Sequence, residues 1–134
     1  MSRVLVDSNV LLDVMTEDEQ WFGWSSSTLA ACAADSVLAI NPVIYAEVSI
    51  RFESIEDLEA ALPPSLIERL PIPWEAAFLA GKCFLRYRRR RGSKELLLPD
   101  FLIGAHAAVE DLPMVTRDPR RFRSYFPSVA LICP

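Results

Sequence analysis

The sequence is short of the residues that build disulfide frameworks, zinc sites and phosphate-binding loops. Its three cysteines are an odd number and lie far apart, with no C-x-x-C pair, so neither a disulfide framework nor a zinc site is indicated. We expect Cys32, Cys83 and Cys133 to be small buried apolar side chains. The motifs G-x-x-x-x-G-K-S/T, G-x-G-x-x-G and G-x-S-x-G are absent, which argues against ATP, dinucleotide and acyl chemistry.

Long hydrophobic runs are also missing. The apolar stretches fall short of the roughly 18 residues that a membrane span needs, and the first residues lead through a short apolar run to Asp7, unlike a signal peptide. We therefore expect a cytoplasmic protein with no membrane segment. With 134 residues, 51% of them hydrophobic, the chain is long enough for one core, and we expect a single domain over residues 1–134.

Basic side chains are scarce in the first part of the chain. The net charge is -4, but residues 1–81 hold 13 acidic and 3 basic side chains, a net of -10, and residues 82–134 hold 5 acidic and 11 basic ones, a net of +6. The acidic total therefore excludes a uniformly basic nucleic-acid binder, but not contact between nucleic acid and the second part. The acidic part could attract a basic partner.

Short apolar runs alternate with helical patterns along the chain. We expect strands at residues 3–6, 37–40, 67–72, 114–116 and 129–132. We expect helices at about 10–15, 18–34, 42–51, 54–63, 74–91, 99–111 and 119–125. Pro71 places the 67–72 strand at a sheet edge. Gly92 ends the long helix at 74–91. This alternation predicts an α/β fold, with a central, mostly parallel twisted sheet of four to five short strands flanked by helices.

Two aspartates come soon after predicted strands. Asp7 directly follows the first strand and Asp118 is three residues after Val115, at the sheet edge where ligands bind in open α/β folds. Taken singly, each has a simpler explanation, because Asp7 can cap the following helix and Asp118 can cap the turn at Pro119.

Two further acids lie on the inner faces of predicted helices. Glu47 shares a face with Ile44 and Val48, where an unpaired carboxylate is costly; Arg51, one turn on, is its alternative partner. Asp100 suits the first turn of a helix through the helix dipole alone, yet it also continues the smooth face of Ile103 and Gly104. Both side chains are expected to point inward.

Together, the four acids predict one pocket of carboxylates. Four such charges repel one another unless protons or a divalent cation neutralise them, and an all-oxygen set suits one or two Mg²⁺ or Mn²⁺ ions. Such a site can clamp a phosphodiester and activate water. The only histidine, His106, lies about 120° around the helix from Asp100 by the helical period, so we expect a structural role for it. A paired-histidine mechanism is therefore disfavoured.

Four stretches, VDSNVLLD at 6–13, NPVIYAE at 41–47, LPDFLIGAHA at 98–107 and VTRDPRRF at 115–122, each contain one of these acids. In order and spacing they resemble the blocks of the PIN domain family, and within it the VapC-type toxins of bacterial toxin-antitoxin pairs. The resemblance implies a single PIN-like domain and a metal-dependent endoribonuclease that cuts single-stranded or looped RNA. It implies Asp7, Glu47, Asp100 and Asp118 as catalytic and metal-binding residues.

The resemblance also implies supporting groups and partners. Ser8, Asn9 and Thr116 would hold the metal-binding side chains in position without binding the metal themselves. A homodimer and a small antitoxin that covers the active site would be the protein partners.

Arginines gather in two places in the second part of the chain. Arg86, Arg88, Arg89 and Arg90 lie near the end of the long helix, and Arg117 and Arg120 flank Asp118. A solvated helix end explains one or two of them, and the others are predicted to bind the RNA backbone. Tyr87 could stack on a base or pack in the core.

Aromatic side chains crowd residues 21–24. Trp21, Phe22 and Trp24 are too close for all three to face one core from a regular helix, so at least one should be partly exposed. A partner-binding surface at Trp21 and Trp24 and an irregular buried helix are both open at this stage. At the level of function, the alternatives are a non-catalytic PIN-like RNA- or protein-binding module and a structure-specific DNA nuclease with the same metal chemistry.

Overall fold

A five-stranded sheet forms the centre of the computed structural model, which describes residues 2–90 and 95–134. Its strands are β1 (Arg3–Val6), β2 (Val37–Ile40), β3 (Ile67–Arg69), β4 (Met114–Val115) and β5 (Leu131–Ile132). They lie in the order β3-β2-β1-β4-β5, and each neighbouring pair is parallel. This confirms the predicted α/β fold. The strand β3 lies at an edge, as Pro71 indicated, and ends before that proline.

Helices connect the strands. They are α1 (Ser8–Met15), α2 (Phe22–Asp35), α3 (Pro42–Ser49), α4 (Ile55–Ala61), α5 (Trp74–Arg90), α6 (Leu98–Val109) and α7 (Arg120–Arg123). Asn41 caps α3 by accepting a hydrogen bond from the Ile44 N–H, and Ser54 caps α4 in the same way. The predicted helix end at Gly92 lies outside the described residues.

The start of α2 differs from the prediction. The sequence pattern predicts a helix from residue 18, but α2 begins at Phe22. The Asp18 carboxylate instead accepts hydrogen bonds from the N–H groups of Gln20 and Trp21, at 3.1 and 2.8 Å. This local turn competes with the helix, and Glu17 just before it has a φ of 49° that no regular helix tolerates.

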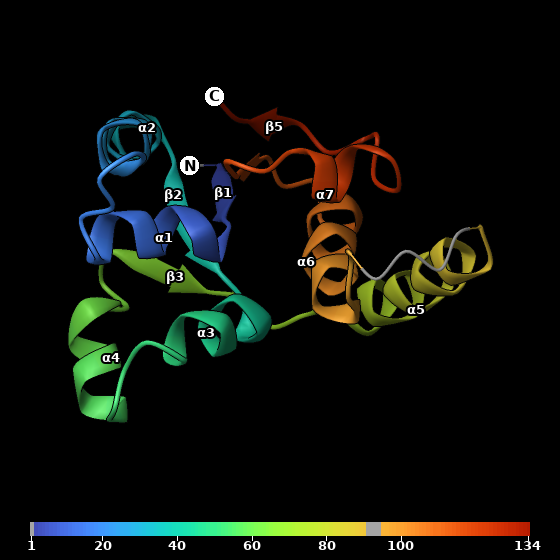
Figure 1. Ribbon diagram of the computed structural model, residues 1–134, viewed down its shortest axis with the longest axis horizontal. Coiled ribbons are helices and arrows are strands. Elements are labelled where there is room, and N and C mark those ends of the chain that lie inside the picture. The colour runs from blue at the N-terminus through green and yellow to red at the C-terminus, as the bar shows by residue number, and fades with distance from the viewer. Residues whose placement is uncertain (1, 91–94) are drawn as a thin grey trace.

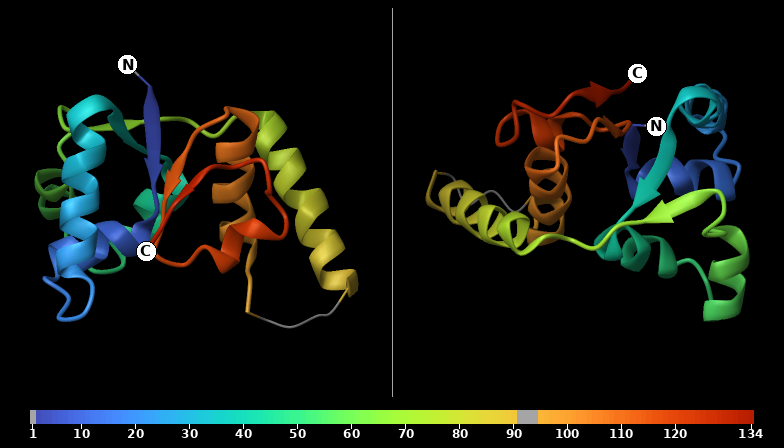
Figure 2. Two further views of the ribbon diagram at one scale, coloured as in Figure 1. Left: turned by 90° about the horizontal axis from the view of Figure 1, so that it is seen from above. Right: turned by 180° about the vertical axis from the view of Figure 1, so that it is seen from behind.

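The helices form two layers around the sheet. The strand order takes the chain from β1 through β2 to β3 and then back past β1 to β4 and β5. Because crossovers between parallel strands share one hand, the two sets of connections lie on opposite faces. Figure 1 accordingly shows α1, α2 and α4 on one side and α5, α6 and α7 on the other, and the view from behind in Figure 2 agrees. The chain therefore leaves β1 and enters β4 by connections on opposite faces, which opens a crevice at their carboxyl ends.

The core lies between the sheet and these layers. Val6, Ile44, Phe101 and Met114 are fully buried or nearly so, at 0–1% exposure. Gly104 packs α6 so closely against the Phe126 ring that a Cβ there would overlap the ring. The acid Asp100 therefore starts a helix whose inner face is dense, as the sequence indicated.

Other expectations concern single side chains. Cys83 is buried, Cys32 and Cys133 are half-buried, and all three are free thiols. Tyr87 is buried against Phe101 and Tyr125, which favours the packing alternative over base stacking. Within residues 2–90 and 95–134, no helix is long and apolar enough to cross a membrane. The cytoplasmic location stays a prediction.

Candidate active site

Asp7 is the most deeply buried of the four predicted acids. It follows β1, caps α1, and is 0% exposed. Its Oδ1 accepts a hydrogen bond from the Ser8 N–H at 2.8 Å, and its Oδ2 accepts one from the Thr116 hydroxyl at 2.8 Å. Burial raises the pKa of Asp7, and the nearby guanidinium of Arg121 opposes that rise. The capping role considered for Asp7 is therefore real, but it accounts for only one of its two oxygens.

Glu47 approaches Asp7 from α3. The Ser8 hydroxyl donates to Glu47 Oε1 at 2.8 Å, so one serine links the two acids by its backbone N–H and its side chain. No ion pair joins Glu47 to Arg51 among the described residues, and the alternative partner suggested by the sequence is wrong. Burial raises the pKa of Glu47, and the hydrogen bond from Ser8 counteracts the rise.

Asp100 reaches the same place from the opposite layer. It lies in the first turn of α6, where its Oδ2 accepts a hydrogen bond from the Leu97 N–H at 2.8 Å and so caps the helix. Its Oδ1 faces inward and accepts from the Arg121 Nε at 2.8 Å. The side chain is 13% exposed, which agrees with the inward direction expected from the helical spacing.

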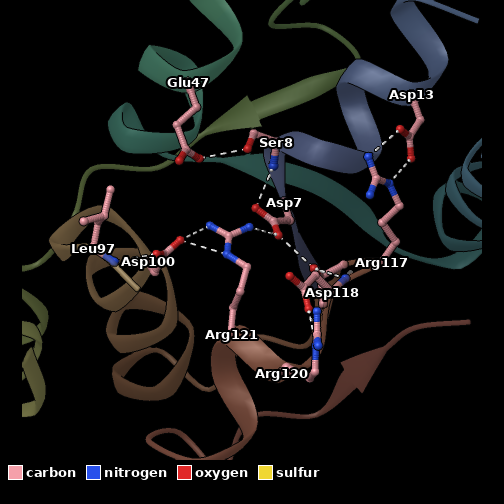
Figure 3. A network of polar contacts seen from close by, with 11 residues as sticks. Asp7, Ser8, Asp13, Glu47, Leu97, Asp100, Arg117, Asp118, Arg120 and Arg121 are labelled. Atoms are coloured by element: carbon pink, nitrogen blue, oxygen red, sulfur yellow. Dashed lines mark hydrogen bonds and ion pairs between the residues drawn. The ribbon is translucent and has the colours of Figure 1, made fainter. Parts of the chain in front are cut away.

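Arg121 lies between these acids. Its Nη1 donates to Asp7 Oδ2 at 2.9 Å, and its Nε and Nη2 donate to Asp100 Oδ1, so that one guanidinium joins the two layers (Figure 3). The Glu47 carboxylate points toward the same guanidinium. Burial alone would lower the pKa of Arg121, but the carboxylates, Asp7 first, outweigh this effect and the pKa is raised.

The sequence reasoning missed Arg121 as a member of the site. Arg121 belongs to the arginine-rich turn after Asp118, and such a turn on its own indicates a solvated surface. The available signal was its spacing, since Arg121 lies three residues after Asp118 and one turn of helix can return such a side chain toward the preceding strand end.

Asp118 lies at the same sheet edge, but its carboxylate takes a different direction. Its Oδ1 is 3.4 Å from the Arg120 Nε, and its side chain is 35% exposed. Its backbone N–H donates to the Thr116 hydroxyl at 3.1 Å, and that hydroxyl donates to Asp7. Three of the predicted acids therefore surround Arg121, and the fourth is tied to them through the loop and Thr116.

Of the three predicted supporting residues, two contact the acids and one does not. Ser8 and Thr116 hold Glu47 and Asp7 as described. Asn9 follows on α1, and its Oδ1 is buried without a hydrogen-bond partner among the described residues. His106 is fully buried and contacts Asn41 Nδ2 and Glu110 Oε1 at 3.0 and 2.9 Å, which confirms that it packs away from the acids.

A cleft of about 450 Å³ opens beside these side chains. Asp100, Asp118, Arg120 and Arg121 line it together with Tyr87, Glu95 and Leu96. Tyr87 is the α5 residue that lines it, whereas Arg86, Arg89 and Arg90 of the same helix lie around a different cavity with Lys82 and Leu85. A second cavity, of about 320 Å³, lies over Tyr45 and Arg69 and holds none of the four acids. The cleft is therefore the place where a ligand can reach Asp100 and Asp118.

The donor set suits a divalent cation in kind. Asp7, Glu47 and Asp100 offer only carboxylate oxygens, which Mg²⁺ and Mn²⁺ prefer, and a cation, the Arg121 guanidinium, stands among them. As the side chains lie, no group of three or more Asp, Glu, His or Cys within the described residues is placed to hold a metal ion. The acids therefore fit such an ion in chemistry, and their present counter-charge is Arg121.

Arg117 differs from its prediction as an RNA-binding residue. Its Nε and Nη2 donate to the two carboxylate oxygens of Asp13, at 2.8 and 3.1 Å, and its guanidinium lies 5.5 Å from the centre of the Trp21 ring. Asp13 is almost fully buried and also accepts a hydrogen bond from Ser25 at 2.8 Å. Arg117 therefore fastens the loop before Asp118 to α1 and α2.

The other predicted contact residues are more accessible. Arg86, Arg88, Arg89 and Arg90 are all exposed near the end of α5, and Arg120 is 91% exposed. Trp21 and Trp24 are half-buried and pack edge to face at 6.4 Å, and Phe22 is 37% exposed. The expectation that the crowded aromatic group would be partly exposed is confirmed.

Comparison with known proteins places these features in a family. The model of the PIN domain matches residues 4–126. A search of curated proteins found no match. Among solved structures, VapBC2 of Rickettsia felis bound to promoter DNA has a TM-score of 0.72 and 18% identity, over 98% of each chain. The DNA-bound VapBC of Salmonella typhimurium has the same TM-score and identity, over 99% of this chain and 98% of that one.

A toxin-antitoxin complex from Klebsiella pneumoniae has a TM-score of 0.66 and 22% identity, over 95% of each chain. At these identities the structural likeness shows the fold.

Proposed function

The chain belongs to the PIN domain family, and on this basis we propose that it is a metal-dependent endoribonuclease, the toxin of a toxin-antitoxin pair. The observation that carries the proposal is the meeting of Asp7, Glu47 and Asp100, from three different elements, beside a cleft that Asp100 and Asp118 line. Buried carboxylates are costly, and a fold keeps several together where their charge has a use.

Asp7, Glu47, Asp100 and Asp118 would hold the divalent ion. Bound Mg²⁺ or Mn²⁺ supplies positive charge that favours ionisation of water and stabilises the leaving oxygen of a phosphodiester. The chain itself fixes the ligands. Ser8 orients both Asp7 and Glu47, and Thr116 holds Asp7 Oδ2, so that these carboxylates are fixed in position.

Glu47 can hold the ion or orient the attacking water. Burial raises its pKa in the metal-free protein, and its carboxylate lies beside Asp7. Its Oε1 is held by the Ser8 hydroxyl, which keeps the carboxylate beside Asp7. We therefore assign to Glu47 the orientation of the water that hydrolyses the phosphodiester.

The substrate would enter along the basic side of the cleft. Arg120 lines it, and Arg86, Arg88, Arg89 and Arg90 lie near the end of the helix that contributes Tyr87. Exposed guanidinium groups bind phosphate oxygens, and a single strand or a loop can lay its backbone along such a row. Arg117 is left out of this surface because Asp13 holds its guanidinium.

We further propose a small antitoxin and a second copy of the chain as partners. The similar structures of Rickettsia felis and Salmonella typhimurium are VapBC assemblies, and in this chain the half-buried Trp21 and Trp24 offer apolar surface for a partner segment. Single Trp21→Ala and Trp24→Ala variants should lose capture of the antitoxin in a pull-down. Retained capture by both variants would contradict this surface.

One observation favours a second candidate. Arg121 already neutralises the acids, as it would in a non-catalytic PIN-like module that binds RNA or protein without a metal.

Cleavage of a labelled single-stranded RNA separates the two. The endoribonuclease requires cleavage with Mg²⁺ or Mn²⁺, its loss with chelator, and its loss in Asp7→Asn and Asp118→Asn. Asp35→Asn is the matched control, because that acid is exposed at the end of α2, before β2 begins. Equal cleavage by all the variants would overturn the assignment. A matched DNA oligonucleotide tests the DNA nuclease alternative.

A further inference from the structure

The guanidinium of Arg121 has more contacts with carboxylates than an RNA-binding arginine needs. It donates to Asp7 Oδ2 at 2.9 Å and to Asp100 Oδ1 at 2.8 Å, and only 16% of its side chain is exposed. The neighbouring Arg120 makes one longer contact, at 3.4 Å, and is 91% exposed. Two adjacent arginines on one short helix are therefore in opposite situations, one committed to the acids and the other in solvent.

The position of Arg121 is set by the fold around it. Phe122, the next residue, is fully buried, and the Arg121 guanidinium lies 5.1 Å from the centre of its ring. The side chain thus passes from an anchored backbone over an aromatic ring into the acid group. An arginine side chain is long and has several rotatable bonds. The Arg121 guanidinium can therefore leave the carboxylates while the backbone of α7 stays in place.

The contacts of Arg121 use oxygens that a metal ion would need. Asp7 Oδ1 already accepts from the Ser8 N–H, and Asp100 Oδ2 caps α6 through the Leu97 N–H. The remaining oxygens, Asp7 Oδ2 and Asp100 Oδ1, are the ones that accept from Arg121. A dication and a guanidinium cannot share these oxygens closely, because their positive charges repel at short range.

We propose that Arg121 is the resident counter-ion of this site and that a divalent ion binds by exchange with its guanidinium. The inference rests on the metal site of the proposed function. Two consequences follow. Arg121 lowers the affinity of the site for the metal, and it keeps the metal-free protein folded by neutralising carboxylates that would otherwise repel. By linkage, a bound metal must weaken the hold of the acids on Arg121 by the same factor.

Metal affinity provides the first test. Calorimetric titration with MnCl₂ should give a dissociation constant about 10- to 100-fold lower for Arg121→Gln than for the unchanged protein, the range of ordinary coupling between two sites. Arg123→Gln is the matched control, because it removes one charge from the same helix, and Arg123 is exposed and contacts Cys133 rather than an acid. Its affinity should equal that of the unchanged protein.

The unchanged protein provides a second test, which does not depend on folding of the variant. The Arg121 Nε–H, held by Asp100, should give a protected signal in a ¹⁵N-¹H spectrum recorded in chelator, and MgCl₂ should shift or broaden it. The exposed Arg123 signal should not change.

The outcomes separate this inference from the proposed function. Equal or weaker Mn²⁺ binding by Arg121→Gln, or an Arg121 signal that ignores Mg²⁺, overturns the exchange, while RNA cleavage by the same preparation would leave the nuclease standing. Failure of every variant to bind Mn²⁺ overturns both. Tighter binding by Arg121→Gln alone, with movement of the Arg121 signal, supports the exchange.

Discussion

Removal of Arg117 should destabilise the fold rather than only weaken RNA binding. The carboxylate of Asp13 is 3% exposed, and Arg117 and Ser25 both donate hydrogen bonds to it. The Arg117→Ala change removes the first of these partners and leaves Ser25. Breaking a buried ion pair from one side costs about 3–5 kcal/mol. The Arg117 side chain is 32% exposed, so solvent screening reduces this to about 2–3 kcal/mol. Loss of the contact with Trp21 adds about 0.5–1 kcal/mol.

The expected total is therefore about 3 kcal/mol in the free energy of unfolding, measured by urea denaturation. Arg117→Lys keeps the charge but loses one of two parallel hydrogen bonds, and should cost about 1–1.5 kcal/mol. The double variant Asp13→Ala/Arg117→Ala should lose less stability than the sum of the two single variants, by about 1–2 kcal/mol. Each single variant already removes the contact that the two residues share.

Arg120→Ala provides the contrasting variant. Its side chain is 91% exposed, so its unfolding free energy should stay within about 0.5 kcal/mol of the unchanged protein while RNA affinity falls. The reasoning would be refuted if Arg117→Ala also changed stability by less than about 0.5 kcal/mol and lost RNA affinity instead. That result would restore Arg117 to the RNA-binding surface that the sequence predicts.

Three further variants probe the core, the acid group and its titration. Gly104→Ala places a Cβ against the Phe126 ring and should cost about 1–3 kcal/mol in thermal unfolding; an unchanged melting temperature would contradict this packing. Ser8→Ala frees Glu47 and should lower the RNA cleavage rate about 10- to 100-fold with little change in fold, and an unchanged rate would contradict the role of Ser8. Burial raises the folded-state pKa of Glu47 above its ordinary 4.5, so the folded form retains this proton to higher pH than the unfolded form. In chelator, protonation of Glu47 should therefore add to the free energy of unfolding. This contribution should be fully present below about pH 4.5 and be lost as pH rises through the raised pKa. Urea unfolding of Glu47→Gln at several pH values should not show this loss of stability. Identical pH profiles for the variant and the unchanged protein would contradict the raised pKa.

Much of the fold follows from local patterns. Asn41-Pro42 predicts the start of α3, Ser54 the start of α4 and Pro71 the edge position of β3, because caps and proline act within a few residues of themselves. The start of α2 is the counterexample. There the Asp18 side chain competes for backbone N–H groups, and apolar spacing carries no record of that competition.

The inward direction of Asp7, Glu47 and Asp100 could also be predicted. Each acid occupies a strand end or the inner face of a helix, and the helical and strand periods decide which side such a residue faces. The parallel sheet then gathers the carboxyl ends of β1 and β4 at one edge. Spacing therefore sufficed to bring three acids from distant stretches into one group.

The identity of their counter-charge was not predictable in this way. Arg117, Arg120 and Arg121 stand within five residues and look alike in the sequence, yet one pairs with Asp13, one lies in solvent and one lies among the acids. Which arginine reaches which carboxylate depends on the angle at which α7 leaves β4 and on the burial of Phe122. Periodicity, capping and charge patterns are local and act through the chain, so they determined the sheet, the helices and the set of acids. The pairing of long side chains across layers is a contact between residues such as Arg121 and Asp7, more than a hundred positions apart, and only the packed tertiary structure decides it.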